Sequence, residues 1–130
     1  MTTKGFAALM AGAFLISAGP AFAGPWDGIY RQNKTSDCAS VGHVGGSLEI
    51  REGVFYGQGL ACRMTRPVDV LDMDATLYTM DCVDGNGEDA EHWSERVMMM
   101  RDAEGEGIIM VWNGYSFRYE ACAVEVAPAS

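Results

Sequence analysis

The oxygen-bearing side chains of residues 84–89 form the arrangement in this sequence that comes nearest to a metal site. The segment reads Asp84-Gly85-Asn86-Gly87-Glu88-Asp89 and places carboxylate or amide oxygens at alternate positions, as calcium-binding loops do. Its sixth position is an aspartate where such a loop has glycine, and the flanking sequence has no helical periodicity. We therefore expect an acidic hairpin turn here, with Asp84, Asn86 and Glu88 as the candidate ligands of a weak calcium site.

A second group that could bind metal is the run of methionines at residues 98–100, because thioether sulfur suits Cu(I). Consecutive side chains of a strand point to opposite faces, so Met98, Met99 and Met100 cannot converge on one ion. Methionine is also a common filler of irregular cores. The run is therefore expected to pack in the core rather than to bind copper.

Side chains in catalytic combinations are few. His43 and His92 are the two histidines of the chain, too few for a three-histidine zinc site. Ser94, His92 and Asp89 can be assembled on paper as a nucleophile, base and acid, but no GxSxG segment or other sign of an oxyanion hole accompanies them. The sequence therefore predicts a protein that is not an enzyme and has no cofactor.

Residues 1–23 have the pattern of a cleavable export signal. A short basic start, Met1 to Lys4, precedes an apolar run from Gly5 to Ala18, and the small-residue cleavage site is Ala21-Phe22-Ala23. The apolar run is shorter than the roughly 20 residues that a membrane-spanning helix needs. We expect a protein of the periplasm or the secreted medium, with one domain at residues 24–130, a frayed tail at 127–130 and no membrane contact after cleavage.

Export gives the cysteine count a meaning, because an oxidising compartment allows thiols to pair. Cys38, Cys62, Cys82 and Cys122 form an even set, and their spacing is not that of a CxxC redox or zinc motif. Of the three pairings, we favour Cys62 with Cys82, which would join neighbouring strands, and Cys38 with Cys122. In the chain-entropy model each bond would stabilise the fold by roughly 3 to 5 kcal/mol.

The elements that must position these side chains are short strands, because apolar residues recur with a period near two and turn residues are frequent. Extended segments are predicted over residues 28–32, 47–51, 54–57, 60–64, 75–83, 91–101, 108–112 and 115–120, and an edge strand over 68–71 after Pro67. Asn113-Gly114 predicts a type I′ hairpin turn. About eight strands without an amphipathic helix indicate an all-β antiparallel meander, closed into a barrel or folded into a sandwich. Closure would bring the first and last strands together, as the pairing of Cys38 with Cys122 requires.

The residues predicted to face inward are bulky. They are Leu48 and Ile50, Tyr78 and Met80, and Tyr115, Phe117 and Tyr119 on the last strand. In an eight-stranded barrel, large inward side chains fill the centre. This pattern favours a filled core and a function at the surface over an internal ligand cavity.

The chain is acidic, with eighteen Asp and Glu against nine Lys and Arg and a formal net charge of −9. Binding to a nucleic-acid backbone depends on clustered basic residues, so this class of function is excluded. An acidic surface does suit a basic protein partner, because opposite fields speed encounter. Trp26 and Trp112 would be the anchors of such an interface if they were exposed at one end of the barrel.

One set of residues carries a resemblance to known proteins. The set comprises Trp26, Gly28-Ile29-Tyr30, Cys38, Leu48, Ile50, Cys62, Cys82 before a glycine-rich turn, Trp93, Trp112 and an aromatic strand ending at Cys122. In these features the chain resembles the small four-cysteine exported proteins of Gram-negative bacteria, most of which have no assigned activity. It is more distantly similar to exported β-barrel inhibitors of proteases or lysozymes. This second likeness implies a binder of another protein and transfers no site residue.

The function expected from the sequence is that of a non-enzymatic binding module, with inhibition of a basic lysozyme or protease as its most specific form. A small-ligand carrier of lipocalin-like type and a purely structural role are the alternatives. The sequence leaves the oligomeric state and the choice between barrel and sandwich open.

Overall fold

The structure is a computed structural model that describes residues 24–123 together with Gly12. The predicted export signal, Gly12 apart, and the predicted frayed tail at residues 127–130 lie outside the described residues. In the described part of the chain, no helix has the length and apolar character needed to cross a membrane.

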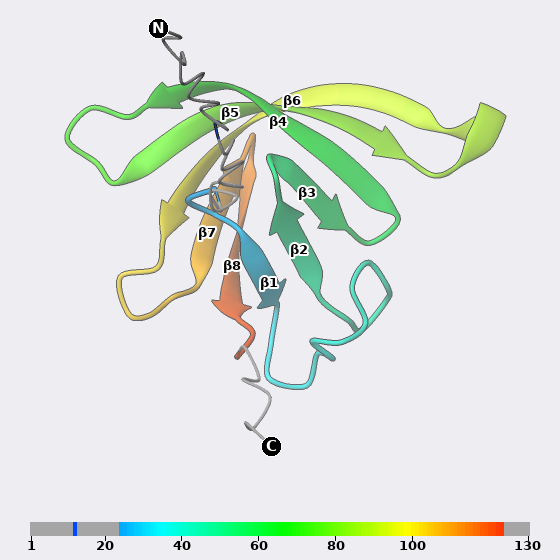
Figure 1. The fold of residues 1–130 in the computed structure, drawn as a ribbon, viewed down its shortest axis with the longest axis horizontal. Coiled ribbons are helices and arrows are strands. Elements are labelled where there is room, and N and C mark those ends of the chain that lie inside the picture. The colour runs from blue at the N-terminus through cyan, green and yellow to red at the C-terminus, as the bar shows by residue number, and fades with distance from the viewer. Residues whose placement is uncertain (1–11, 13–23, 124–130) are drawn as a thin grey trace, which may run out of the picture.

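Eight antiparallel strands follow one another around a closed barrel (Figure 1). They are β1 (Gly28–Arg31), β2 (Leu48–Arg51), β3 (Val54–Gly57), β4 (Leu60–Asp69), β5 (Ala75–Asp84), β6 (Glu91–Arg101), β7 (Ile108–Trp112) and β8 (Tyr115–Ala121), with a 3-10 turn, η1 (Gly87–Asp89), between β5 and β6. Each strand pairs with the next, and β1 also pairs with β8. The predicted all-β meander is confirmed, and the closed barrel decides between the two architectures left open.

The predicted edge strand at residues 68–71 is wrong, because β4 continues through Pro67 to Asp69. The pairing of β4 with β5 shifts register between Thr65 and Val68, and Arg66 has a positive φ of 51°. Proline has no N–H to donate, and a bulge removes it from the ladder without ending the strand. Val68 therefore lies on β4, and Leu71 lies in the turn that follows.

Three neighbouring strands are much longer than the first three strands of the barrel. β4, β5 and β6 contain 10, 10 and 11 residues, whereas β1, β2 and β3 contain 4 each. The β4–β5 and β5–β6 hairpins consequently project beyond the barrel, to opposite sides in Figure 1. The two ends of the barrel are thus each flanked by one projecting hairpin.

The core consists of alternate residues from the barrel strands. Ile50, Met80, Val97, Ile108 and Met110 are fully buried. The prediction of Leu48, Ile50, Met80 and Tyr119 as inward residues is confirmed, since all four are buried. The methionine run alternates as expected, because Met99 is buried whereas Met98 and Met100 are partly exposed.

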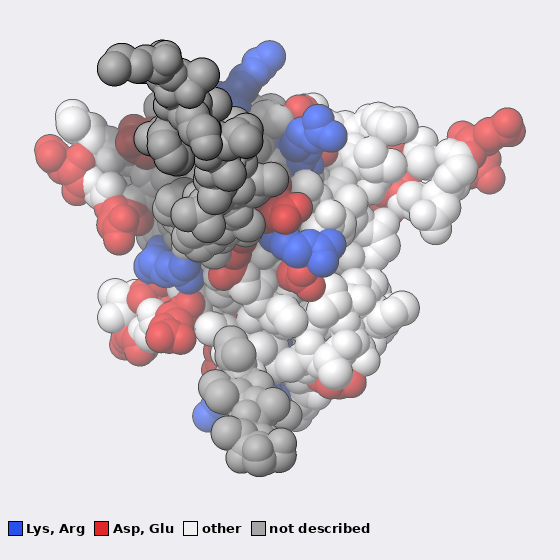
Figure 2. All heavy atoms as spheres, in the orientation of Figure 1, with Lys and Arg blue, Asp and Glu red and all other residues white. Residues whose placement is uncertain are grey.

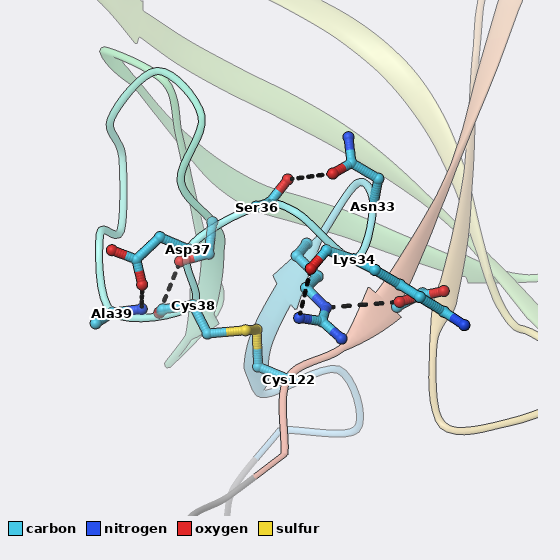
Figure 3. Close-up of a disulfide and its surroundings, with 10 residues drawn as sticks. Asn33, Lys34, Ser36, Asp37, Cys38, Ala39 and Cys122 are labelled. Atoms are coloured by element: carbon cyan, nitrogen blue, oxygen red, sulfur yellow. Dashed lines mark hydrogen bonds and ion pairs between the residues drawn. A yellow bond between two sulfur atoms is a disulfide. The ribbon is translucent and has the colours of Figure 1, made fainter.

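Both predicted disulfides are present. Cys62 and Cys82 occupy directly paired positions on β4 and β5, with 4.0 Å between their Cα atoms, and both are buried. Cys38 and Cys122 are bonded with 6.0 Å between their Cα atoms, which ties the loop after β1 to the end of β8 (Figure 3). Disulfides indicate an oxidising, extracytoplasmic environment.

Trp26 closes the end of the barrel at which β1 begins. Its indole N–H donates to the Tyr78 hydroxyl at 2.8 Å, and its carbonyl accepts from the Tyr30 hydroxyl at 2.6 Å. The Arg101 guanidinium lies 5.4 Å from the centroid of the Trp26 ring and donates to Tyr30 and to the Pro25 carbonyl. Hydrogen bonds and a cation–π contact therefore hold this side chain in place as a plug.

Candidate functional site

The end of the barrel opposite Trp26 contains an open pocket of about 610 Å³. It lies where β1 ends, β2 begins, β3 turns into β4, β7 ends and β8 begins. This volume is within the range of roughly 300 to 1,000 Å³ that is common for ligand-binding pockets. The barrel is thus closed at one end and open at the other.

One wall of the pocket is a row of aromatic rings from three successive strands. The row consists of Trp93 on β6, Trp112 on β7, and Tyr115, Phe117 and Tyr119 on β8. The centroids of successive rings lie 6.1, 6.2, 5.5 and 5.8 Å apart. We call this row of five rings the aromatic wall.

The hairpin turn between β7 and β8 sets the spacing of the aromatic wall. Gly114 has a φ of 101°, but Asn113 is not among the residues with a positive φ, so the predicted type I′ turn, which needs a positive φ at both positions, is wrong. The two-residue turn nevertheless places Trp112 directly opposite Tyr115. Phe117 and Tyr119 follow on the same face of β8 because the side chains of a strand alternate. The local sequence from 112 to 119 thus builds four of the five rings.

The prediction that Tyr115 and Phe117 fill the core is wrong, because 51 % of Tyr115 and 38 % of Phe117 remain exposed. β1 pairs with β8 only through Tyr30 with Ala121 and Arg31 with Glu120. The first half of β8 therefore has β7 on one side and no strand on the other. The short β1 leaves these two rings facing an open space instead of a packed core.

The facing wall of the pocket is polar and comes mainly from the loop between β1 and β2. It includes Gln32, Asn33, Thr35, Ser36 and His43, together with Gln58 from the β3–β4 turn. The Asn33 carboxamide oxygen accepts hydrogen bonds from Thr35 N at 3.0 Å, Thr35 Oγ1 at 2.6 Å and Ser36 Oγ at 3.2 Å. These bonds fix the start of the loop, and the Cys38–Cys122 disulfide holds its middle.

Tyr119 lies at the inner end of the aromatic wall and keeps its proton at neutral pH. Burial raises the pKa of its hydroxyl to about 12, and a hydrogen bond with Gln32 opposes the rise. The group therefore offers a neutral hydroxyl to its surroundings and is not a candidate base.

The charge of the pocket is low although the chain is acidic. Neither Asp nor Glu is among the described residues that line it, and the lining guanidinium of Arg31 forms an ion pair with Glu120 at 3.5 Å. The indole N–H of Trp112 is buried and finds no acceptor among the described residues. A buried donor without an acceptor costs about 1 to 3 kcal/mol, so Trp112 is held in the aromatic wall at a cost in stability.

The two tryptophans expected to share an exposed interface are both buried and lie at opposite ends of the barrel. Trp26 is 6 % exposed in the plug, and Trp112 is 7 % exposed in the aromatic wall. The prediction of these two residues as joint surface anchors is therefore wrong. Trp112 nevertheless belongs to the candidate site, because it lines the pocket.

The calcium candidate gains no support from the arrangement of its residues. Asp84, Asn86 and Glu88 are exposed in and around η1, and no group of three or more His, Cys, Asp or Glu among the described residues could hold a metal ion. The catalytic combination that the sequence offers with Ser94 and His92 is not formed either. Ser94 instead donates to Asp81 at 2.6 Å, across the β5–β6 ladder.

The pocket contradicts the prediction of a filled core without a ligand cavity, because the bulky side chains of Tyr115 and Phe117 line an open space instead of filling it. Two features signalled the pocket: an aromatic stripe on a strand directly after Trp112, and a long polar, glycine-rich segment between the first two strands. Which aromatic rings remain exposed depends on the lengths of β1 and β8. The alternation of apolar and polar residues does not determine these lengths.

Comparison of the chain with protein-family models, with curated proteins and with solved structures finds no match to any of them. The fold and the pocket define a small disulfide-bonded β-barrel that is plugged at one end and open at the other.

Proposed function

We propose that the protein is a non-enzymatic binding module, exported to the periplasm or the medium, that takes a small ligand into the aromatic pocket. The observation that carries this proposal is the 610 Å³ pocket at the open end of the barrel. Eight-stranded barrels are just wide enough either to be filled by side chains or to hold one small ligand. Here the side chains fill the plugged end and leave space at the other.

The composition of the lining supports binding rather than catalysis. Aromatic rings supply apolar area at one wall, and amide and hydroxyl groups supply hydrogen bonds at the other. The hydroxyls of Thr35 and Ser36 are engaged with Asn33, and that of Tyr119 stays protonated. None of these three hydroxyls is paired with a base that would activate it.

Ligand-induced stabilisation tests the proposal directly. The disulfide-bonded protein is screened by thermal unfolding against a library of small molecules, and a ligand at about 100 times its Kd should stabilise it by about 2.7 kcal/mol. The variant Phe117→Glu places a charge in the pocket and should abolish the shift. The control Val68→Glu makes the same change at an exposed β4 position of the opposite end and should leave the shift intact.

Equal loss of the shift in both variants, or no stabilising ligand in a library that spans neutral, cationic, anionic and apolar compounds, would contradict the proposal. Because Phe117 and Val68 are both partly exposed, neither substitution removes a core side chain.

A second candidate function, capture of a basic protein, is favoured by the acidity of the β5–β6 hairpin. Its carboxylates are Asp84, Glu88, Asp89, Glu91 and Glu95. Figure 2 shows acidic side chains at the tip of this hairpin. Its second strand, β6, contains Trp93, which lines the pocket. Opposite charge at the rim of an interface speeds encounter, so a basic lysozyme or protease would be a suitable partner. Reduced activity of such an enzyme at low salt, relieved at high salt, is the expected result; unchanged activity across a panel of basic enzymes would reject this candidate.

A further inference from the structure

The described lining of the pocket offers no unpaired charge to an ionic ligand. A cation would find no carboxylate among the described lining residues, and an anion would find one guanidinium, Arg31, that Glu120 already neutralises. Transfer of an ion from water to a pocket without a counter-charge has a large desolvation cost. The acidic hairpin beside the opening and the net charge of −9 add a field that repels anions. An uncharged ligand meets neither difficulty.

The aromatic wall presents two exposed rings to the open pocket, Tyr115 at 51 % and Phe117 at 38 % exposure, whereas Trp112 and Tyr119 are buried. The centroids of these two exposed rings lie 5.5 Å apart and their planes meet at 73°, so the pair offers ring surface in two orientations rather than a flat platform. The negative face of an aromatic ring attracts polarised C–H groups, which line the faces of a sugar ring. Nucleobases also stack on such rings, but their phosphates are incompatible with the charge of this protein. The exposed pair of rings therefore suits the C–H faces of neutral sugar rings.

The polar wall supplies groups that can both donate and accept. Side-chain amides of Gln32 and Gln58 carry a donor and an acceptor each, as hydroxyl groups do. Hydroxyl groups on a ligand would match these amides, whereas an apolar ligand would leave them unpaired.

From these three observations we infer that the ligand is an uncharged oligosaccharide, with its ring faces on the aromatic wall and its hydroxyl groups toward the loop between β1 and β2. This inference rests on the proposed function, because it names the ligand class of the same pocket. Recognition is shared by two walls of different chemistry, so a molecule that satisfies only one of them binds less tightly.

The experiment titrates the disulfide-bonded protein by calorimetry and by tryptophan fluorescence. The neutral probes are cello-, malto- and chito-oligosaccharides of increasing length, and the comparison probes are oligogalacturonate, choline and a fatty acid. We expect at least one neutral series to bind, with affinity that rises with the number of sugar units. Its Kd should be the same at low and high salt, because no counterion is displaced.

Variants locate the bound sugar. Tyr115→Ala and Phe117→Ala should each weaken binding by about tenfold, the size of one stacking contact. The matched control is Tyr56→Ala on β3, which removes an aromatic ring outside the pocket lining. Its affinity for the same oligosaccharide should be unchanged.

The outcomes separate this inference from the proposed function. Binding of choline, oligogalacturonate or fatty acid alone, lost in Phe117→Ala, overturns the oligosaccharide inference and leaves a ligand-binding pocket in place; choline in particular would indicate a cation–π site. Neutral oligosaccharide binding that survives both ring deletions overturns the placement in the pocket. Binding of none of the probes overturns the inference, and the wider library screen then decides the proposed function.

Discussion

Side chains of one type take different roles in this barrel because their neighbours differ. Trp26 has its N–H satisfied by Tyr78 and its ring covered by Arg101, and it serves as a plug. Trp112 is equally buried, but its N–H has no hydrogen-bond acceptor among the described residues, and the exposed ring of Tyr115 stacks beside it. Composition reports both residues as tryptophan, and only the contacts distinguish a structural role from a place in a site.

Tyr119 gives a prediction about pH. Burial raises the pKa of its hydroxyl from 10.0 to about 12 in the folded protein, so the folded state favours the protonated form. Its contribution is therefore complete below about pH 10 and is lost as pH rises toward 12, with a size of at most about 3 kcal/mol. Urea unfolding between pH 8 and 12 should show a smaller loss of stability in Tyr119→Phe than in the parent protein. Identical curves for the variant and the parent would contradict the assignment.

Gly107 and Gly105 form a matched pair on the turn between β6 and β7. A Cβ atom at Gly107 would lie 2.2 Å from the Tyr119 carbonyl oxygen, whereas one at Gly105 meets no atom within 4 Å. Gly107→Ala must therefore displace the backbone beneath the aromatic wall, and we expect it to destabilise the protein by about 1 to 3 kcal/mol. Gly105→Ala should be nearly neutral in the same chemical denaturation assay. A cost that is equal at the two positions would show that the close approach is unimportant.

At the scale of elements, local patterns fix what each strand is, and closure of the barrel fixes what each face does. Alternation and the Asn113-Gly114 turn were sufficient to predict β8 and its pairing with β7. The same alternation wrongly placed Tyr115 and Phe117 in the core, because exposure depends on β1, a strand more than eighty residues earlier, being too short to cover them. The prediction of a separate edge strand after Pro67 failed for another reason, since a bulge accommodates this proline within β4. Sequence patterns therefore predict elements and their order well, but they do not predict which surfaces closure leaves open.

The loop between β1 and β2 is the element whose order depends most on a disulfide. It forms the polar wall, and Cys38 connects it to Cys122 across a sequence separation of 84 residues. The double variant Cys38→Ala with Cys122→Ala should lose roughly 3 to 5 kcal/mol of stability in the chain-entropy account. In hydrogen exchange, residues 32–47 should become the most strongly deprotected segment, whereas the β5–β6 ladder should change least. Uniform deprotection of the whole chain would show that the bond supports the barrel rather than the loop.

At the scale of the whole molecule, the two ends of the barrel differ in shape more than in charge. Both projecting hairpins carry exposed acidic side chains (Figure 2), with Asp69, Asp72 and Asp74 at the β4–β5 end and Glu88, Asp89 and Glu91 at the β5–β6 end. The aromatic pocket opens at the second end, whereas Trp26 packs into the core at the first and a smaller hollow of about 420 Å³ lies beside it, between the start of β1 and the β6–β7 turn. A partner or ligand that inserts a group between the aromatic rings must therefore approach from the β5–β6 end.

This asymmetry allows a charge-matched test of where a basic partner binds. Neutralising Glu88, Asp89 and Glu91 to the corresponding amides should slow association with a cationic protein at low salt, because electrostatic attraction raises the encounter rate. The same change at Asp69, Asp72 and Asp74 alters the net charge equally but acts at the plugged end. Association rates measured by surface plasmon resonance should therefore fall several-fold more for the first triple variant than for the second. The three proteins should converge as salt shortens the Debye length to a few ångströms. Equal slowing by both variants would mean that only the net charge matters and that the open end has no privileged role.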